Sequence, residues 1–261
     1  MPGRSPGNLA LCAASLLACV ASAAATAAGP SSLPKHACKA GSRLLAGYCR
    51  TLIAYDTYSR ALGPGELGPS NRGGLWSVYT TRTVAVDGRA AQAVVAPAKT
   101  NRDYLNAVKC GDCDVEIDVR WDRLPTGSGA HFYLCARTNP AGNPAGYSLL
   151  LDSRAAPAGT VLLQLAKYDS QGRRTLLGRP FSVTGSYKPD TFFHLRFRLL
   201  GKNLYGSAWL RGTKPPARWQ VHAVDASFRR GGVGLRIVNT QQAQHAPLYT
   251  VDNLAAYRLS N

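Results

Sequence analysis

The sequence predicts an all-β protein made of two packed antiparallel sheets. From Trp76 onward, apolar and polar residues alternate with a period of two, as in half-buried strands. Turn-forming clusters such as LPTGSG, NPAGNPAG and GKN separate these runs at short intervals. No amphipathic helix of convincing length interrupts them. Many short strands without helices favour a two-layer sandwich.

Each predicted strand combines an alternating apolar side with a Gly, Pro, Asn or Asp turn at one end or both. The last two, GGVGLRIVN and YTVDNLAAYRL, are typical of how secreted sandwiches end. A further strand is expected within 44–55. The predicted strands of the sandwich cover residues 75–86, 90–97, 113–121, 130–137, 146–153, 160–169, 174–181, 192–201, 203–212, 219–225, 231–239 and 249–259.

The amino terminus has the layout of a secretory signal peptide, predicted for residues 1–28. Arg4 precedes an apolar run from Leu9 to Val20, and the small residues that follow offer cleavage points after Ala27 or Ala28. The apolar run is too short to span a bilayer. We therefore expect a secreted or periplasmic protein with no transmembrane span. A lipid anchor on Cys19, within the lipobox-like LLAC, is the less favoured alternative.

The mature chain is expected to form one domain. Residues 29–71 are rich in Gly, Pro and Ser and predict an irregular N-terminal extension, whereas 72–261 carry the sandwich. Of the seven cysteines, five follow the leader, and export predicts that most are paired. Cys38 and Cys49 bracket a short loop and are expected to bridge. Cys110 and Cys113 favour a structural bridge over a redox site, with Cys135 as another possible partner.

The net charge of +17 is far from ordinary and favours a polyanionic partner. The basic residues are scattered singly, so a solvated basic surface is the simpler interpretation. Export argues against nucleic acid as the partner. An acidic polysaccharide or cell-envelope glycan fits both the charge and the expected location, and we expect the protein to be a monomer.

Strand register suggests a surface site. If 113–121 and 130–137 form a hairpin, matching their apolar sides sets Val115 opposite Leu134 and Ile117 opposite Phe132. The opposite face of that hairpin would then present Glu116, Asp118, His131, Tyr133 and Arg137 together.

The ordered set of strands resembles the concanavalin A-like lectin/glucanase superfamily. The resemblance rests on GGLWSVYTTRTVAVDGR, DVEIDVRW, FYLCAR followed by GYSLLLD, VLLQLAKYDSQGRRTLL, FHLRFRLLGKNLYGSAWLRG, GGVGLRIVN and YTVDNLAAYRL. It covers most of the mature chain and implies a bent jelly-roll sandwich with a concave face that commonly receives glycan.

The resemblance also bears on catalysis and on metal binding. Glu116 and Asp118 match the first two acids of the laminarinase-type Glu-x-Asp strand, but Arg120 and Trp121 stand where the second Glu, the proton donor, belongs. Retaining hydrolysis needs two carboxyl groups in distinct roles. Asp252 matches an aspartate that often ligates a structural calcium in these relatives; the alternative is an aspartate bonded locally beside Asn253. No other cofactor is expected.

The sequence therefore favours a non-catalytic glycan- or envelope-binding module. The alternatives are a glycoside hydrolase that uses Glu116 and Asp118, and a structural envelope protein. In the favoured interpretation, aromatic side chains stack on the sugar and cationic ones contact its acidic or hydroxyl groups. The expected ligand-binding residues are His131, Tyr133, Arg137, Tyr147, Lys167 and Trp209.

Overall fold

The computed structural model describes residues 38, 41–45, 47–79, 84–123, 129–139, 145–153, 160–183, 188–241, 243 and 245–260. The predicted signal peptide and Cys19 lie outside these residues. The described residues form strands, turns and irregular segments, and none of them forms a helix long and apolar enough to cross a membrane. The all-β prediction is therefore confirmed.

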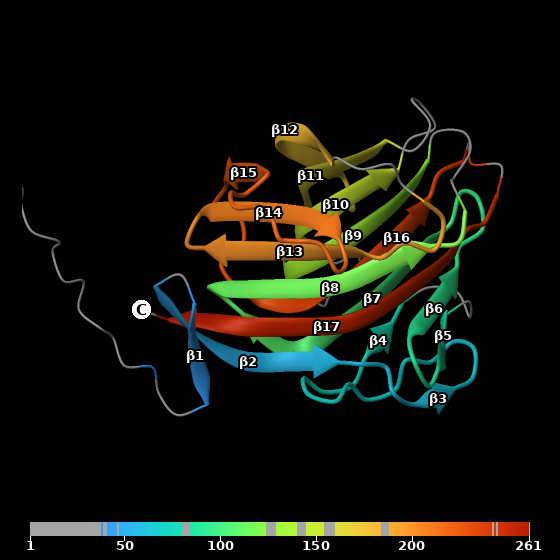
Figure 1. The fold of residues 1–261 in the computed structure, drawn as a ribbon, viewed down its shortest axis with the longest axis horizontal. Helices are drawn as coiled ribbons and strands as arrows, with labels where there is room; N and C mark the ends of the chain where they lie inside the picture. The colour runs from blue at the N-terminus through green and yellow to red at the C-terminus, as the bar shows by residue number, and fades with distance from the viewer. Residues whose placement is uncertain are drawn as a thin grey trace, which may run out of the picture. The chain divides into compact units, whose positions relative to one another are not determined.

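Seventeen strands run through the described residues and form two stacked antiparallel sheets (Figure 1). The strands are β1 (Ser42–Leu45), β2 (Tyr48–Asp56), β3 (Ala61–Leu62), β4 (Ser77–Val78), β5 (Val84–Asp87), β6 (Ala91–Val94), β7 (Thr100–Cys110), β8 (Cys113–Trp121), β9 (Ala130–Thr138), β10 (Gly146–Ser153), β11 (Val161–Tyr168), β12 (Arg174–Val183), β13 (Phe193–Leu200), β14 (Asn203–Leu210), β15 (Val221–Val224), β16 (Gly231–Asn239) and β17 (Leu248–Ser260).

The ten-stranded sheet has the order β15-β14-β13-β8-β17-β6-β5-β3, and β2, with β1 beside it, pairs with the second half of β17. The seven-stranded sheet has the order β12-β11-β10-β9-β16-β7-β4. Neighbours in each order are antiparallel, and several are distant in the sequence, as in a jelly roll. The predicted two-sheet jelly-roll sandwich is confirmed.

The core lies between the sheets because one side of nearly every strand is apolar. On β8, Val115, Ile117 and Val119 are fully buried, and on β9 the interior residues are Phe132 and Leu134. Since successive side chains of a strand point to opposite faces, the alternation that fills this core also sends polar side chains outward.

The predicted hairpin between 113–121 and 130–137 is wrong. Strand β8 pairs with β13 and β17, whereas β9 pairs with β10 and β16, so the two strands lie in different sheets. Their apolar sides both point into the core, from opposite layers. Alternation identifies the buried face of a strand but does not identify its neighbour, and this is why the sequence misled the pairing.

Strand β7 is absent from the strands predicted by the sequence. Its eleven residues include Asn101 and Asp103, which are fully buried, and Arg102 faces the other way. Polar residues at interior positions break the apolar alternation on which the prediction depends. The strand nevertheless belongs to the seven-stranded sheet, where it lies between β16 and the edge strand β4.

The described part of the predicted extension contributes to the sandwich. Strand β2 confirms the strand expected within 44–55 and pairs with β17. A disulfide joins Cys38 to Cys49 on this strand. A second disulfide joins Cys110 to Cys113, at the turn between β7 and β8. Cys135 is buried and free, and burial raises the pKa of its thiol to about 11.

Candidate functional site

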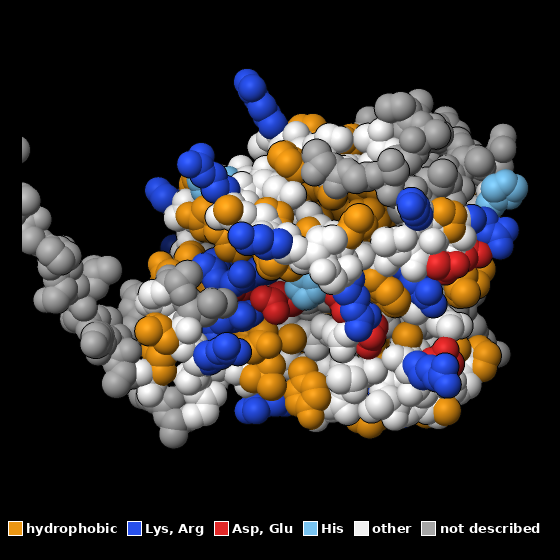
Figure 2. Space-filling view, viewed as in Figure 1, with side chains coloured by type: hydrophobic (Ala, Val, Ile, Leu, Met, Phe, Trp, Pro, Cys, Tyr) orange, Lys and Arg blue, Asp and Glu red, His pale blue; other side chains and the backbone are white. Residues whose placement is uncertain are grey.

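The outward face of the ten-stranded sheet carries a polar surface at the centre of the sandwich. Figure 2 shows acidic side chains in the middle of this face, bordered by Lys and Arg. The register aligns these side chains in rows across the strands. One row runs Asp252–Asp118–His194–Trp209, the next Glu116–Arg196–Ser207, and the third Tyr257–Asp114–Arg198–Tyr205.

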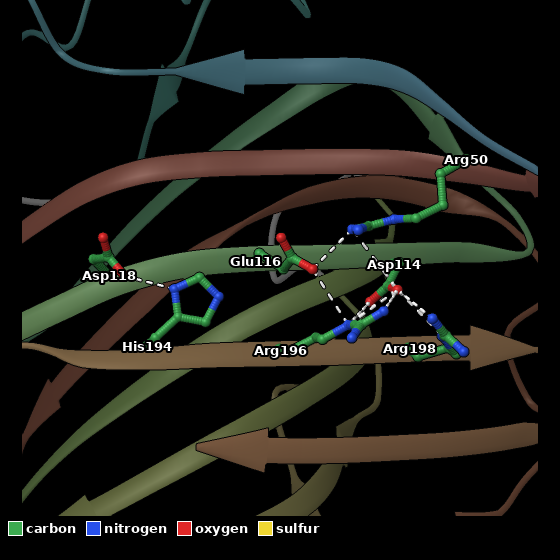
Figure 3. A network of polar contacts seen from close by, with 7 residues as sticks. All are labelled: Arg50, Asp114, Glu116, Asp118, His194, Arg196 and Arg198. Atoms are coloured by element: carbon green, nitrogen blue, oxygen red, sulfur yellow. Dashed lines mark hydrogen bonds and ion pairs between the residues drawn. The ribbon is translucent and has the colours of Figure 1, made fainter. Parts of the chain in front are cut away.

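Asp114 is the centre of a cluster of three arginines (Figure 3). Its carboxylate accepts hydrogen bonds from Arg196 Nη2 at 2.5 Å and Arg198 Nη2 at 2.7 Å, and Arg50 Nη2 lies 3.8 Å away. Asp114 is fully buried. Burial alone would raise the pKa of this carboxyl, but the bonds from Arg196 and Arg198 hold it below its ordinary value. Asp114 is therefore ionised near neutrality.

Glu116 joins the same cluster from the adjacent outward position of β8. Its Oε1 accepts a hydrogen bond from Arg50 Nη2 at 2.8 Å and lies 3.2 Å from Arg196 Nε. Arg50 reaches this carboxylate from β2 across the ring of Tyr257, 3.7 Å from the ring centroid. The cluster thus links β2, β8 and β13 through charge.

Asp118 forms a second group at the other end of β8. Its Oδ1 lies 2.7 Å from His194 Nδ1, and its Oδ2 accepts a hydrogen bond from Asn253 Nδ2 at 3.0 Å. The His194 ring packs against Trp209, with centroids 4.5 Å apart. Burial raises the pKa of Asp118, but the bonds from His194 and Asn253 outweigh it and leave the pKa below its usual value.

A pocket of about 190 Å³ opens beside these groups, over β13 and β14 and under the segment that leads to β15. Trp209 and Trp219 are its aromatic walls, and both are partly exposed. The guanidinium groups of Arg196 and Arg198 lie 5.3 Å and 5.1 Å from the Trp219 ring centroid. The pocket is lined by Arg196, Arg198, Ser207, Trp209, Pro215, Pro216, Ala217, Arg218 and Trp219.

The same two tryptophans also line an adjoining hollow of about 580 Å³. Pro216 and Arg218 also line both spaces, so the hollow adjoins the pocket at the tryptophans, and the two together are called the depression. Arg218 is exposed and makes no ion pair or hydrogen bond with any residue that the structure describes. The depression therefore combines aromatic surfaces with an uncompensated cation.

His131 and Tyr133 do not share a surface with Glu116 and Asp118, so the predicted common face is wrong. Because β9 belongs to the other sheet, its outward side chains point away from those of β8. His131 Nε2 lies 3.1 Å from Asp152, and its Nδ1 lies 3.2 Å from the Tyr133 hydroxyl. Tyr133 is 1% exposed, which leaves no ring face open for a sugar.

Arg137, Tyr147 and Lys167 also lie away from the depression, and all three contact the segment between β15 and β16. Arg137 is 2% exposed and donates to the carbonyl oxygens of residues 111, 201 and 228. Tyr147 and Lys167 both donate to Asp225. Of the ligand-binding residues predicted by the sequence, Trp209 alone lines the depression.

Asp252, the predicted calcium ligand, has protein partners for both of its carboxylate oxygens. Its Oδ2 lies 3.5 Å from Arg211 Nη1, and its Oδ1 accepts a hydrogen bond from the backbone N–H of Asn253. Asp118, its cross-strand neighbour, is engaged by His194. No group of three or more His, Cys, Asp or Glu side chains suited to a metal gathers in the described part of the chain.

The position of the missing proton donor is also filled differently. Arg120 extends from the outward face and lies 3.4 Å from Asp190, whereas Trp121 packs into the core against Phe193. Two carboxyl groups on β8, those of Asp114 and Asp118, have lowered pKa values. Burial raises the pKa of Asp252, which lies one strand away.

Sequence reasoning missed Arg50, Arg196 and Arg198, and it considered Trp219 for sugar stacking without selecting it as a binding residue. A signal was present: the segment HLRFR of 194–198 repeats basic residues with the same period of two as the acids in DVEID of 114–118. Opposite charges at matching spacing stabilise neighbouring strands, so this complementarity predicts the β8–β13 pairing. The Arg50 contact crosses an intervening strand and has no comparable sequence signal.

Comparison with known proteins identifies the fold of the chain but does not assign an activity to it. No family model matches the chain, and no curated protein matches it. The structure is similar to a protein of unknown function with a galectin-like fold from Bacillus subtilis, at 10% identity and a TM-score of 0.53, over 82% of this chain and 99% of that one.

Two further similar structures are the exoplasmic/lumenal domain of VIP36 bound to Ca²⁺ and Man3GlcNAc, and the β-glucanase of Bacillus licheniformis. The first has 13% identity and a TM-score of 0.51, over 79% of this chain and 91% of that one. The second has 11% identity and a TM-score of 0.50, over 78% and 96%. Binding proteins and hydrolases thus share this architecture, and the fold of the chain is a concanavalin A-like jelly roll.

Proposed function

We propose that this protein binds an acidic polysaccharide in the depression lined by Trp209 and Trp219. We propose further that it does not cleave this ligand. The observation that carries the proposal is the pair of partly exposed tryptophans bordered by Arg196, Arg198 and Arg218. Sugar rings have apolar faces that stack on indole rings, and guanidinium groups form paired hydrogen bonds with carboxylates. The pocket and the adjoining hollow together offer space for several sugar units, which suits a polymer better than a single small molecule.

The setting that we propose is outside the cytoplasm. The disulfides Cys38–Cys49 and Cys110–Cys113 support it, because such bonds persist in oxidising compartments. The surplus of 31 Lys and Arg over 14 Asp and Glu supports an acidic polymer as ligand, since a positively charged protein concentrates polyanions at its surface.

Binding without cleavage is supported by the contacts of the β8 acids. A glycoside hydrolase needs one carboxyl that holds a proton near neutral pH, and this requires a raised pKa. Asp118 instead has a lowered pKa, and Glu116 contacts Arg50 and Arg196. The competing function, hydrolysis through Glu116 and Asp118, is favoured by their placement on one face of β8.

The binding proposal predicts a selective response to aromatic and arginine substitutions. Trp209→Ala and Trp219→Ala should each weaken binding of polygalacturonate about tenfold or more, a loss of ~1.4 kcal/mol, by isothermal titration calorimetry. Arg218→Gln should weaken binding of polygalacturonate but not of neutral laminarin. Arg179→Gln, an exposed arginine on β12, is the control and should bind like the wild type. Failure of the wild type to bind any glycan tested, or binding unchanged in both tryptophan variants, would refute the proposal.

Hydrolysis is tested separately by reducing-sugar release from mixed β-glucans and acidic glycans. We expect no release above that of heat-denatured protein. Release that Glu116→Gln or Asp118→Asn abolishes, in variants that still bind the glycan, would establish the competing function instead.

A further inference from the structure

The segment between β15 and β16, residues 225–230, is fixed at one end of the sandwich. Asp225 accepts hydrogen bonds from Lys167 Nζ and from the Tyr147 hydroxyl, each at 2.6 Å. It also accepts one from the backbone N–H of Ser227 at 2.8 Å. With its carboxylate held by these donors, Asp225 has a pKa well below its ordinary value despite partial burial. These contacts fix the start of the segment.

Phe228 fixes the middle of the segment. Its backbone N–H donates to the Tyr147 hydroxyl at 3.0 Å, and its carbonyl accepts from Arg137 Nη1 at 3.1 Å. Its ring meets that of Tyr147 edge to face, with centroids 5.1 Å apart. Immediately beyond, Gly231 begins β16 opposite Cys110. Arg229 and Arg230 are therefore carried on a backbone that is anchored on both sides.

A pocket of about 600 Å³ opens beside this segment. It is lined by Lys109, Arg137, Thr138, Asn139, Ser227, Phe228, Arg229, Arg230 and Gly231. Lys109, Arg229 and Arg230 are exposed cations, while the lining includes neither aspartate nor glutamate. The space is large enough for a charged group together with part of the molecule that carries it.

The three exposed cations are not neutralised by the described residues. Arg229 and Arg230 form no ion pair with them, and Lys109 makes one long hydrogen bond, 3.3 Å, to the carbonyl of Asn106. The nearby carboxylates pair with other cations: Asp225 with Lys167, and Asp112 with the buried Arg137 of the lining, at 3.2 Å. Like charges gathered in a pocket repel one another, so the site is stabilised when an anion enters it.

We propose that this pocket is a second, separate binding site, for a tetrahedral oxyanion such as a phosphate or sulfate group. Two guanidinium groups offer paired N–H donors whose geometry matches phosphate and sulfate oxygens, and the ammonium group adds a mobile point charge. Three cations also favour a group that carries up to two negative charges over a single carboxylate. The source of the group is either the free ion or an ester on a polymer. This proposal does not depend on glycan binding at Trp209 and Trp219.

The test compares two double variants with equal loss of charge. Arg229→Gln/Arg230→Gln removes the arginines of the pocket, whereas Arg89→Gln/Arg179→Gln removes two exposed arginines elsewhere. Each protein is titrated with inorganic phosphate and with dextran sulfate, and unmodified dextran serves as the blank. Binding is followed by calorimetry, and circular dichroism confirms that both variants are folded, as expected for exposed substitutions.

The pocket variant should bind at least one of the two charged probes about tenfold more weakly than the wild type, while the control variant changes by less than about twofold. Weakening confined to dextran sulfate identifies a polymer-borne ester as the source, and weakening toward phosphate identifies the free ion. Equal weakening in both double variants would mean that net charge alone binds the probes. That result, or a wild type that binds neither probe, would overturn the proposal.

Discussion

Replacing Asp103 with asparagine should raise the free energy of unfolding at about pH 8.5 and change it little, or lower it, at about pH 4.5. Asp103 is fully buried on β7, and it lines a cavity of about 10 Å³ together with Leu235, Ile237, Tyr249 and Val251. Its Oδ2 accepts a hydrogen bond from Asn101 at 2.7 Å, but its Oδ1 has no hydrogen-bond partner among the residues that the structure describes. Burial raises the pKa of Asp103 to about 8.

The sign of the effect follows from proton binding. The folded pKa lies above the unfolded one, so the folded protein retains a proton that the unfolded chain releases between these two pKa values. The stabilisation is complete below the unfolded pKa and is lost as the pH rises through about 8. At ~1.4 kcal/mol per pKa unit, the whole effect is on the order of 5 kcal/mol.

Urea unfolding of the wild type and of Asp103→Asn between about pH 4.5 and pH 8.5 measures the effect. The other titrating groups contribute equally to both proteins, so the difference between the two free energies of unfolding reports Asp103 alone. Asp190→Asn is the matched control, since Asp190 lies in an exposed turn. A wild-type stability that exceeds that of Asp103→Asn by a constant amount from acid to alkaline pH would show that Asp103 does not hold a proton in the folded state.

The class of fold was predictable because alternation directly reports which side of a strand is buried. Most predicted strands occur, and the interior positions of β8 and β9 are those that the apolar pattern indicated. The pairing of these strands was not predictable in the same way. Placing β8 and β9 side by side or in facing layers buries the same apolar side chains, and strand partners far along the chain decide between the two.

The candidate site was predictable in part. Glu116, Asp118 and Trp209 were recognised by residue type and do lie on one face. His131, Tyr133 and Arg137 were recognised by the same reasoning but lie on the other sheet, buried by contacts that one strand pattern cannot reveal. The depression itself requires Trp219, which reaches Arg196 and Arg198 through the folding of a segment outside the strands.

Replacing Asp114 with asparagine should destabilise the protein by about 3–5 kcal/mol near neutral pH, because it leaves buried cations without their counter-charge. Arg198 is 5% exposed, and Arg196 and Arg50 converge on the same carboxylate. Glu116→Gln removes a partly exposed carboxylate from the same cluster and should cost about 1 kcal/mol. Chemical unfolding of the two variants separates a specific role of Asp114 from a general effect of charge.

A double variant makes the explanation testable. If the loss comes from an uncompensated Arg198, then Asp114→Asn/Arg198→Met should be more stable than the sum of the two single changes predicts, with a coupling of about 1–3 kcal/mol. Additive losses would contradict the explanation. The pH dependence should have the opposite sign to that of Asp103: the folded pKa of Asp114 is lowered, so its stabilisation is fully present above the ordinary carboxyl pKa and is lost as the pH falls from there through the lower folded pKa. Asp114→Asn should therefore lose its disadvantage in acid, where the wild-type carboxyl is protonated and the three arginines repel one another in both proteins.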